Sequence, residues 1–326
     1  MRVTRVNGRP SGMTLALCPL GRTGLHVHPL CFGGNVFGWT ANEATSFEIL
    51  DAYVAAGGNF VDTADAYSYW VPGNVGGESE AILGRWMAAR GNRSRMIIAT
   101  KVGLDPEHAG LSRANIEAAV AGSLTRLQTD TIDLYYAHKD DPKTPLLETV
   151  LALDALVKAG KVRHLGASNY DAPRLLEALA VAKGAGAHPF EVLQPEYNLM
   201  VRADFEGAVR DVCEKEGLAC LPYFSLARGF LTGKYRAGVT VDSARASGAT
   251  AYLGERGNRV LKVLGELADA HRVKPAAVAL AWLVAQKTVA SVLSSARTLQ
   301  QLKDILPMAE LRLSTAEIAA LTEASA

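Results

Sequence analysis

Strand-like and helix-like segments alternate along almost the whole chain, and this alternation restricts the fold more than any other feature. Short apolar runs rich in β-branched and aromatic residues occur at residues 30–34, 60–62, 96–102, 132–138, 162–167, 192–194, 218–223 and 289–293. Helical patterns separate most of them, at residues 44–56, 79–89, 113–127, 146–159, 172–183, 205–216 and 259–271. Eight strands that alternate with helices over about 280 residues predict one parallel (β/α)8 TIM barrel.

A doubly wound dinucleotide-binding sheet would also alternate strands with helices, but it requires a glycine-rich turn after its first strand. The stretch Gly33-Gly-Asn-Val-Phe-Gly38 lacks the G-x-G-x-x-G order, and no helical pattern begins directly after it. We therefore interpret residues 1–326 as a single barrel domain. An N-terminal extension at residues 1–14 and a β-hairpin formed by residues 15–17 and 25–27 precede the barrel, and C-terminal helices follow it.

The composition argues against several classes of partner. The chain has 34 Lys and Arg against 33 Asp and Glu, so we expect neither nucleic acid nor an anionic membrane as a partner. No apolar run reaches the ~20 residues of a membrane helix, and the N-terminus does not resemble a signal peptide. The four cysteines form no Cys-x-x-Cys pair. We expect free thiols, no metal site and a reducing, cytoplasmic location.

Three of the expected strands end in groups that can transfer or bind protons. The segments are Phe60-Val-Asp-Thr-Ala-Asp-Ala-Tyr67, Ala99-Thr-Lys101 and Leu134-Tyr-Tyr-Ala-His138. Parallel-barrel enzymes carry their reacting groups at the C-terminal ends of the strands, which selects Asp62, Tyr67, Lys101 and His138. A lysine that is held by a carboxylate and lies beside a tyrosine makes the phenol a usable proton donor or acceptor.

With these residues placed, the chain resembles the aldo-keto reductase family. The resemblance runs from about residue 20 to residue 305. It rests on Leu20-Gly-Arg-Thr-Gly24, Val61-Asp-Thr-Ala-Asp-Ala-Tyr67, Ala99-Thr-Lys101, His138, Gly166-Ala-Ser-Asn169, Gln194-Pro-Glu-Tyr-Asn198 and Leu226-Ala-Arg-Gly-Phe-Leu-Thr-Gly-Lys-Tyr235. It implies a (β/α)8 barrel and NAD(P)(H)-dependent reduction of aldehydes and ketones to alcohols, or the reverse, by direct hydride transfer.

The resemblance implies that Asp62, Tyr67, Lys101 and His138 are a catalytic tetrad. Tyr67 is then the proton donor to the carbonyl oxygen. Lys101, kept charged by Asp62, is expected to lower the pKa of Tyr67 from its usual value of ~10. His138 is expected to hydrogen-bond the substrate oxygen and to orient it.

The resemblance also implies a cofactor site that runs across the strand ends. Its expected residues are Ser168, Asn169 and Gln194 at the nicotinamide carboxamide, Tyr223 on the nicotinamide ring, Ser225, Leu226, Ala227, Lys234 and Arg245 at the pyrophosphate, and Ser295, Arg297 and Gln301 at the adenosine end. Ser295 replaces a glycine and Ile305 an asparagine that are common in the family. Arg297 nevertheless favours NADP(H) over NAD(H), because a planar, bidentate cation suits a phosphate.

The substrate side follows from a long connection after Tyr67. Many relatives have Gly-x-Gly-x-Ser-Glu close to the catalytic tyrosine, whereas residues 68–80 here are several positions longer. Aromatic side chains expected to line the substrate pocket are Phe37, Trp39, Tyr69 and Trp70. Such walls suit a bulky or ring-containing carbonyl or alcohol substrate. The alternative is that these rings pack the loop onto the barrel.

Two other functions are compatible with part of this pattern. One is a nicotinamide-binding regulatory subunit resembling the potassium-channel β subunits of the same family, but these carry Asn at the position of His138. The other is a (β/α)8 lyase or isomerase with Lys101 as a Schiff base, which leaves Tyr67 and the Arg297 segment unexplained. The sequence leaves the physiological substrate, the preferred direction and the oligomeric state undetermined.

Overall fold

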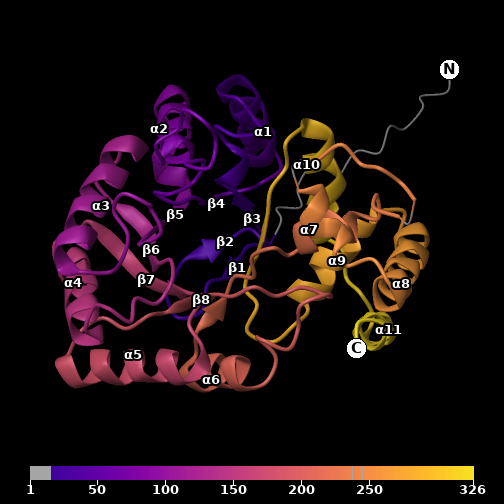
Figure 1. The fold of residues 1–326 in the computed structure, drawn as a ribbon. Coiled ribbons are helices and arrows are strands. Elements are labelled where there is room, and N and C mark those ends of the chain that lie inside the picture. The colour runs from indigo at the N-terminus through magenta and orange to yellow at the C-terminus, as the bar shows by residue number, and fades with distance from the viewer. Residues whose placement is uncertain (1–15, 237, 244) are drawn as a thin grey trace.

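The computed structural model describes residues 16–236, 238–243 and 245–326, with parallel strands at the centre and helices around them (Figure 1). The strands of this sheet are β3 (Leu30–Gly33), β4 (Phe60–Asp62), β5 (Ile97–Val102), β6 (Ile132–Ala137), β7 (Val162–Ser168), β8 (Val192–Gln194), β9 (Ala219–Cys220) and β10 (Val292–Ser294). Neighbours pair in parallel in the order β10-β3-β4-β5-β6-β7-β8-β9.

The sheet closes on itself between β9 and the residues just before β10. The amide of Cys220 donates to the carbonyl of Thr288 at 2.8 Å, and the amide of Ala290 donates to the carbonyl of Cys220 at 3.1 Å. These two bonds continue the parallel ladder across the remaining gap. The (β/α)8 barrel expected from the sequence is therefore confirmed.

The helices lie on the outside of the barrel, and most begin where the sequence supplies a start signal. They are α1 (Glu43–Ala55), α2 (Glu78–Arg90), α3 (Arg113–Leu127), α4 (Leu146–Lys158), α5 (Ala172–Ala185), α6 (Ala208–Glu216), α7 (Ala246–Thr250), α8 (Glu255–His271), α9 (Pro275–Val284), α10 (Leu299–Ile305) and α11 (Thr315–Ala324). Ser112 caps α3, and Ser314 forms a capping box with Glu317 at α11. The C-terminal helices expected after the last strand are α10 and α11.

A short antiparallel hairpin precedes the barrel, but its first strand is not where the sequence suggested. The strands are β1 (Cys18–Pro19) and β2 (His26–Val27), with Pro19 paired to His26. The Leu20 amide donates to the Leu25 carbonyl at 2.9 Å, which closes a tight turn and starts the pairing directly beside it. Residues 16 and 17 therefore lie outside the hairpin. Residue 15 and the expected N-terminal extension lie outside the described residues.

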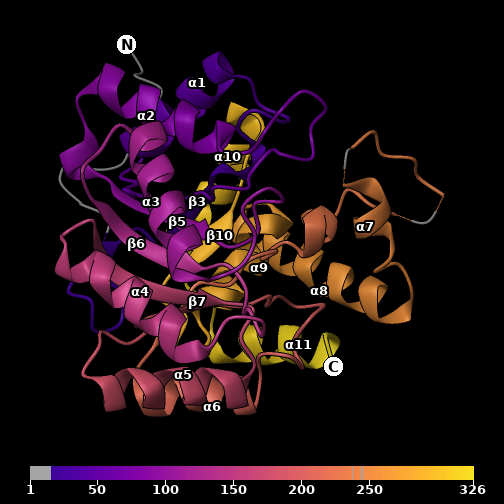
Figure 2. The same ribbon diagram turned by 60° about the vertical axis from the view of Figure 1, so that its left-hand side comes forward.

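Two long connections leave the C-terminal ends of strands. Residues 63–77 join β4 to α2, and residues 221–254 join β9 to α8. The second contains a 3-10 segment (Ala227–Thr232) and the short helix α7, which projects beside the barrel in Figure 2. Both connections lie on the face that carries chemistry in this fold.

Two apolar cores hold the barrel together. One lies between the strands and the helices, and the other fills the barrel interior with side chains that include Phe60, Ala99, Leu134, Tyr136 and Val192. The interior is a packed core, as in other barrels of this type. In the described part of the chain, every helix is too short or too polar to cross a membrane.

Candidate active site

The alternation of side chains along three adjacent strands explains why the expected catalytic groups meet. Interior core residues occur on each strand, namely Phe60 on β4, Ala99 on β5 and Tyr136 on β6. Successive side chains of a strand alternate between its two faces, so the residue two positions further on also faces the barrel axis. Those positions hold Asp62, Lys101 and His138, at the C-terminal ends of the strands.

Lys101 is the centre of the resulting hydrogen-bond network. Its Nζ donates to Asp62 Oδ1 at 2.5 Å, to the Tyr67 hydroxyl at 2.9 Å and to the Thr63 carbonyl at 2.8 Å. The other Asp62 oxygen accepts from Gln194 Nε2 at 2.9 Å. Neither the Lys101 nor the Asp62 side chain is exposed to solvent. The buried ion pair is thus compensated, because the Lys101 ammonium donates to three acceptors and both oxygens of Asp62 accept hydrogen bonds.

The charges of this network determine which of its groups are protonated. Burial alone would lower the pKa of Lys101, but the Asp62 carboxylate and Tyr67 outweigh it and raise that pKa, so the amine stays protonated. Burial raises the pKa of Tyr67 to about 12, and Lys101 opposes that rise. The effect of Lys101 has the expected direction, but the net shift of Tyr67 is upward because desolvation of the phenolate is larger. Tyr67 is therefore a protonated phenol at neutral pH.

His138 lies beside Tyr67, with the two ring centres 6.1 Å apart. Burial, and then the Lys101 ammonium, lower the pKa of His138 well below its ordinary value, so the imidazole is neutral. Its Nδ1 atom is buried and has no hydrogen-bond partner among the described residues. The backbone carbonyl of His138 accepts from Asn169 Nδ2 at 2.9 Å, which fixes the end of this strand.

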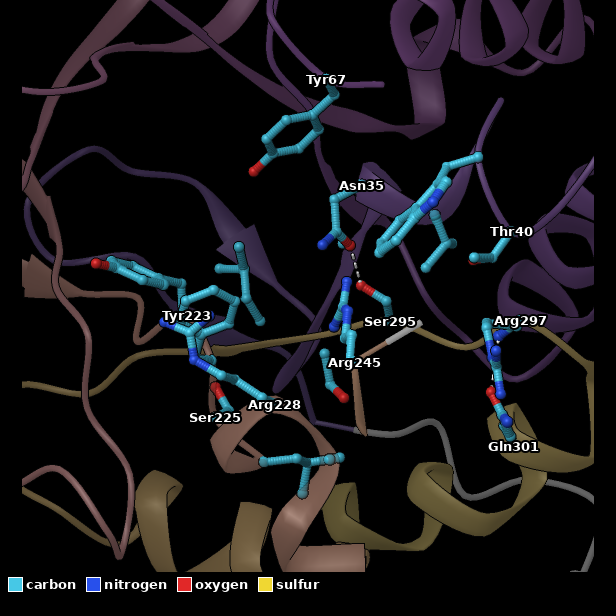
Figure 3. Close-up of a pocket in the computed structure, with 18 of the residues that line it drawn as sticks. Asn35, Thr40, Tyr67, Tyr223, Ser225, Arg228, Arg245, Ser295, Arg297 and Gln301 are labelled. Carbon is cyan, nitrogen blue, oxygen red and sulfur yellow. Dashed lines mark hydrogen bonds between the residues drawn. The ribbon is translucent and has the colours of Figure 1, made fainter. Parts of the chain in front are cut away.

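A long cavity of about 820 Å³ opens over these groups. In Figure 3, Tyr67 and Tyr223 lie at one end of the drawn pocket, Arg297 and Gln301 lie at the other, and Arg245 lies between. Tyr67 and His138 line the cavity, whereas Asp62 and Lys101 are bonded behind Tyr67 and do not.

A chain of hydrogen bonds fixes the polar residues near Tyr67. The Tyr223 hydroxyl donates to Asn169 Oδ1 at 2.7 Å, Asn169 Nδ2 lies 3.0 Å from Ser168 Oγ, and Ser168 Oγ donates to the Gln194 carbonyl at 2.9 Å. Asn169 has a φ of 58°, a left-handed conformation that asparagine tolerates better than most residues. All four residues line the cavity. The sequence analysis predicted them at the nicotinamide end of a cofactor site.

Cationic side chains dominate the rest of the cavity. They are Arg228, Lys234, Arg245, Lys274 and Arg297, and Asp304 is the acidic lining residue in the described part of the chain. The sequence reading included Lys234, Arg245 and Arg297 but missed the other two. Arg228 lies inside the motif that ends at Tyr235, with its guanidinium 4.2 Å from the centre of the Phe224 ring. Lys274 directly precedes the proline that starts α9, and nothing local marks it as a cavity residue.

The far end of the cavity is built after β10. The backbone amide of Arg297 donates to Gln301 Oε1 at 2.9 Å, so these two residues are held together. Ser295 Oγ donates to Asn35 Oδ1 at 2.5 Å. Asn35 was not predicted, although it follows the first barrel strand and could have been found from that position. Ser225 and Leu226 also line the cavity, but Ala227 is fully buried in the core.

Three of the four predicted aromatic residues border the Tyr67 end of the cavity, and one does not. Trp39, Tyr69 and Trp70 line it. Phe37 is fully buried and stacks on Phe32, with ring centres 5.6 Å apart. The prediction for Phe37 was wrong because its loop folds back onto the barrel, where the ring completes the outer core. The sequence marks an aromatic residue in this loop but not the side it faces.

Comparison with known proteins identifies the family of the chain. The Aldo/keto reductase family matches residues 29–326, and the chain belongs to it. Protein tas of Escherichia coli is 34% identical over 319 residues, covering 89% of this chain and 92% of that protein. Norsolorinic acid reductase of Aspergillus flavus is 31% identical, covering 92% and 78%. An aryl-alcohol dehydrogenase of Pestalotiopsis microspora is 33% identical, covering 80% and 69%. The chain is therefore an oxidoreductase of a family that uses nicotinamide cofactors.

Proposed function

We propose that the protein is an NADP(H)-dependent reductase of aldehydes and ketones in which Tyr67 is the proton donor. One observation carries the proposal: the Tyr67 hydroxyl borders the cavity and lies 2.9 Å from a buried, charged lysine. A reduced nicotinamide, when bound, supplies the hydride. The residues of the chain then have to hold the carbonyl group, deliver a proton to its oxygen and bind the dinucleotide.

Tyr67 can deliver the proton because Lys101 stabilises the tyrosinate that the transfer leaves behind. As the carbonyl oxygen gains negative charge, the phenol O–H bond breaks and the proton passes to that oxygen. The tyrosinate left behind is 2.9 Å from the Lys101 ammonium, which favours the charged form. Asp62 keeps this ammonium protonated. In the reverse reaction the same tyrosine accepts the alcohol proton.

His138 supports the same step without changing its own charge. A neutral imidazole has one N–H donor, and His138 lies in the cavity wall beside Tyr67. We infer that this donor binds the carbonyl oxygen and directs its carbon toward the nicotinamide. The regulatory-subunit alternative provides no reason for a donor at this position.

The polar and cationic lining fits a dinucleotide. The Ser168, Asn169 and Gln194 side chains supply amide and hydroxyl groups near Tyr67, where a carboxamide needs them, and Tyr223 supplies a ring. Further along, the five cationic side chains named above face the cavity with no ion pair between them and any described carboxylate. Arg228, Arg245 and Arg297 are half-buried, whereas Lys234 and Lys274 are exposed. Half-buried cations without a carboxylate partner favour a polyanion. Arg297, at the end opposite Tyr67, is the residue that would bind the 2′-phosphate of NADP(H).

The reaction is tested with purified protein, NADPH and a simple aromatic aldehyde such as 4-nitrobenzaldehyde. We expect steady NADPH oxidation and formation of the alcohol. Tyr67→Phe should lower the rate of hydride transfer by about 10²–10⁴-fold while leaving the dissociation constant of NADPH unchanged. Wild-type turnover in the Phe variant, with chemistry rate-limiting, would show that Tyr67 is not the donor.

The cofactor preference has its own test. Arg297→Ala should weaken NADPH binding by about 10- to 150-fold, because a charge-assisted hydrogen bond contributes about 1.5–3 kcal/mol. NADH lacks the 2′-phosphate and should bind nearly as before. Lys303→Ala removes an exposed charge from α10, the helix that begins just after Arg297, and is the control. Equal losses for both cofactors would remove the basis for an NADP(H) preference.

A further inference from the structure

The four tryptophans of the chain fall into two pairs with different surroundings. Trp86 and Trp282 are fully buried, and their indole N–H groups donate to Asp51 at 2.9 Å and to Thr322 at 3.0 Å. Trp39 and Trp70 line the cavity, and in the described part of the chain their indole N–H groups have no protein acceptor. Trp70 remains 41% exposed. A large, half-exposed ring in a cavity wall provides contact surface for a ligand.

The loop that carries Trp70 is anchored to the barrel, so the ring has a fixed base. Ser68 Oγ donates to the Phe37 carbonyl at 2.7 Å. Asn74 Nδ2 donates to the Gly38 carbonyl and to the Ser68 carbonyl, both at 3.1 Å. These bonds join the connection after β4 to the connection after β3. They hold the two segments that bear Trp70 and Trp39 against each other.

Trp70 is the centre of a cluster of rings that includes the proposed proton donor, Tyr67. The ring of Trp70 meets Trp39 edge-on at 5.6 Å, Tyr69 at 5.5 Å and Tyr67 at 6.3 Å between centres. On the other side of Trp39, the Arg245 guanidinium lies 5.5 Å from the ring centre. Trp70 thus contacts both Tyr67, the proposed proton donor, and Trp39, which lies next to Arg245.

We propose that Trp70 determines substrate specificity by binding the flat ring of an aryl aldehyde or aryl ketone while its carbonyl group is held at Tyr67 and His138. This inference rests on the proposed reduction at Tyr67. Edge-to-face and offset contacts between rings are favourable beyond the area they bury. A ring conjugated to the carbonyl places its face a fixed distance from the reacting carbon, whereas a short alkyl chain cannot reach Trp70 in the same pose.

The charges near this end of the cavity restrict the substrate further. Among the cationic residues that line the cavity, Arg245 contacts one of these rings, Trp39, and the acidic lining residue of the described chain, Asp304, lies three positions after Gln301 at the opposite end. A neutral or anionic aryl carbonyl compound is therefore compatible with the site. A cationic one would meet Arg245 without a compensating carboxylate.

The test compares an aryl with an aliphatic substrate in Trp70→Ala. We expect kcat/KM for 2-naphthaldehyde to fall by about 10- to 100-fold, the range of a lost apolar pocket contact, while kcat/KM for propanal changes less than about threefold. Trp70→Phe should restore most of the aryl preference. Trp86→Phe, which removes the core Trp86–Asp51 bond, should leave the ratio of the two substrates unchanged. Equal losses for both aldehydes in Trp70→Ala would overturn the proposal.

A binding measurement separates this proposal from the proposed reaction. In a Tyr67→Phe background, 2-naphthaldehyde can be titrated onto the protein with NADPH present, and adding Trp70→Ala should raise its dissociation constant about 10-fold or more. An unchanged dissociation constant would refute the Trp70 site. If Trp70 governs binding as expected but wild-type protein oxidises no NADPH, the proposed reaction alone fails.

Discussion

Two buried carboxyl groups lie three residues apart, Asp62 at the end of β4 and Asp65 just after it, and their surroundings are opposite. Asp62 faces the barrel interior, where Lys101, Gln194 and Tyr67 all direct donors at it. Asp65 is only 3% exposed, and no side chain of the described residues donates a hydrogen bond to either of its oxygens. One short segment therefore carries a carboxylate with three side-chain donors and a carboxyl group with none.

The neighbours of Asp65 make its isolation more costly. Glu80 on α2 is fully buried, and it accepts from Thr100 Oγ1 at 2.5 Å and from Arg126 Nε at 2.7 Å. The Tyr135 hydroxyl is buried too and has no partner among the described residues. Burial, and then the Glu80 carboxylate, raise the pKa of Asp65 to about 7. The Ala66 backbone amide opposes this rise, Asp105 adds to it and Arg126 opposes it.

The two carboxyl groups belong to opposite sides of the barrel wall, and we expect these sides to have separate roles. Thr100 lies between Ala99 and Lys101 on β5, and since those two face the interior, Thr100 faces outward. The inner side holds the Asp62–Lys101 pair, which contacts Tyr67, the residue that we propose as the proton donor. The outer side holds a charge cluster that contacts helices α2 and α3. We therefore expect changes on the Asp62 side to affect both activity and stability, and changes on the Asp65 side to affect stability alone.

The largest effect should come from breaking the compensated pair. Lys101→Met leaves Asp62 buried without its cation, which typically costs about 3–5 kcal/mol of folding free energy. Hydride transfer should also fall by at least about 100-fold, because Tyr67 loses the cation that stabilises its charged form. The pH profile of alcohol oxidation should move to higher pH, since Lys101 opposes the rise of the Tyr67 pKa. Urea unfolding and single-turnover kinetics measure the two effects.

The double variant Asp62→Asn with Lys101→Met sharpens the result. It removes both charges, so most of the lost stability should return, whereas activity should stay low. Recovery of activity in the double variant would contradict the role of Lys101 beside Tyr67. Stability that stayed as low as in Lys101→Met would show that the unpaired Asp62 charge is not the cause.

The contrast between Asp62 and Asp65 also shows which parts of the site could be predicted from the sequence. Asp62, Lys101 and His138 were predictable because each ends a short apolar strand, and a period of two residues fixes the face they share. The isolation of Asp65 was not predictable, because it depends on Glu80 and Arg126 from two helices whose packing no local pattern encodes. Phe37 failed for the same reason: its side of the loop is decided by contact with Phe32.

The second prediction concerns Asp65, whose removal should raise the folding stability, whereas the loss of Lys101 should lower it. The folded pKa of Asp65, about 7, lies above the unfolded value of about 3.9. The unfolded chain therefore releases this proton first, and stability falls as the pH rises from about 4 to about 7. Asp65→Asn removes this loss. At pH 8 the variant should be more stable than wild type by up to about 4 kcal/mol. At pH 5 this gain should be smaller by about 2–3 kcal/mol.

Urea unfolding of both proteins at the two pH values gives this difference. Asp51→Asn is a suitable control, because hydrogen bonds from Arg90 lower the pKa of Asp51 and its loss should destabilise the protein at pH 8. An Asp65→Asn variant that is less stable than wild type at pH 8, or equally stabilised at both pH values, would show that the carboxyl is compensated in solution.

The smallest effect should come from the outer cluster while the inner pair stays intact. Thr100→Val keeps the shape of the side chain but removes the O–H donor to Glu80, and a hydrogen bond to a charged group contributes about 1.5–3 kcal/mol. Thr63→Val is the matched control, because the Thr63 hydroxyl donates at 2.8 Å to the neutral Ser79 hydroxyl, and such a bond contributes about 0.5–1.5 kcal/mol. Since Thr100 faces away from the barrel interior, single-turnover hydride transfer should change less than twofold in Thr100→Val. A loss of stability without a loss of rate would separate the two sides of the wall, whereas a slow hydride transfer would show that the outer cluster positions Lys101 as well.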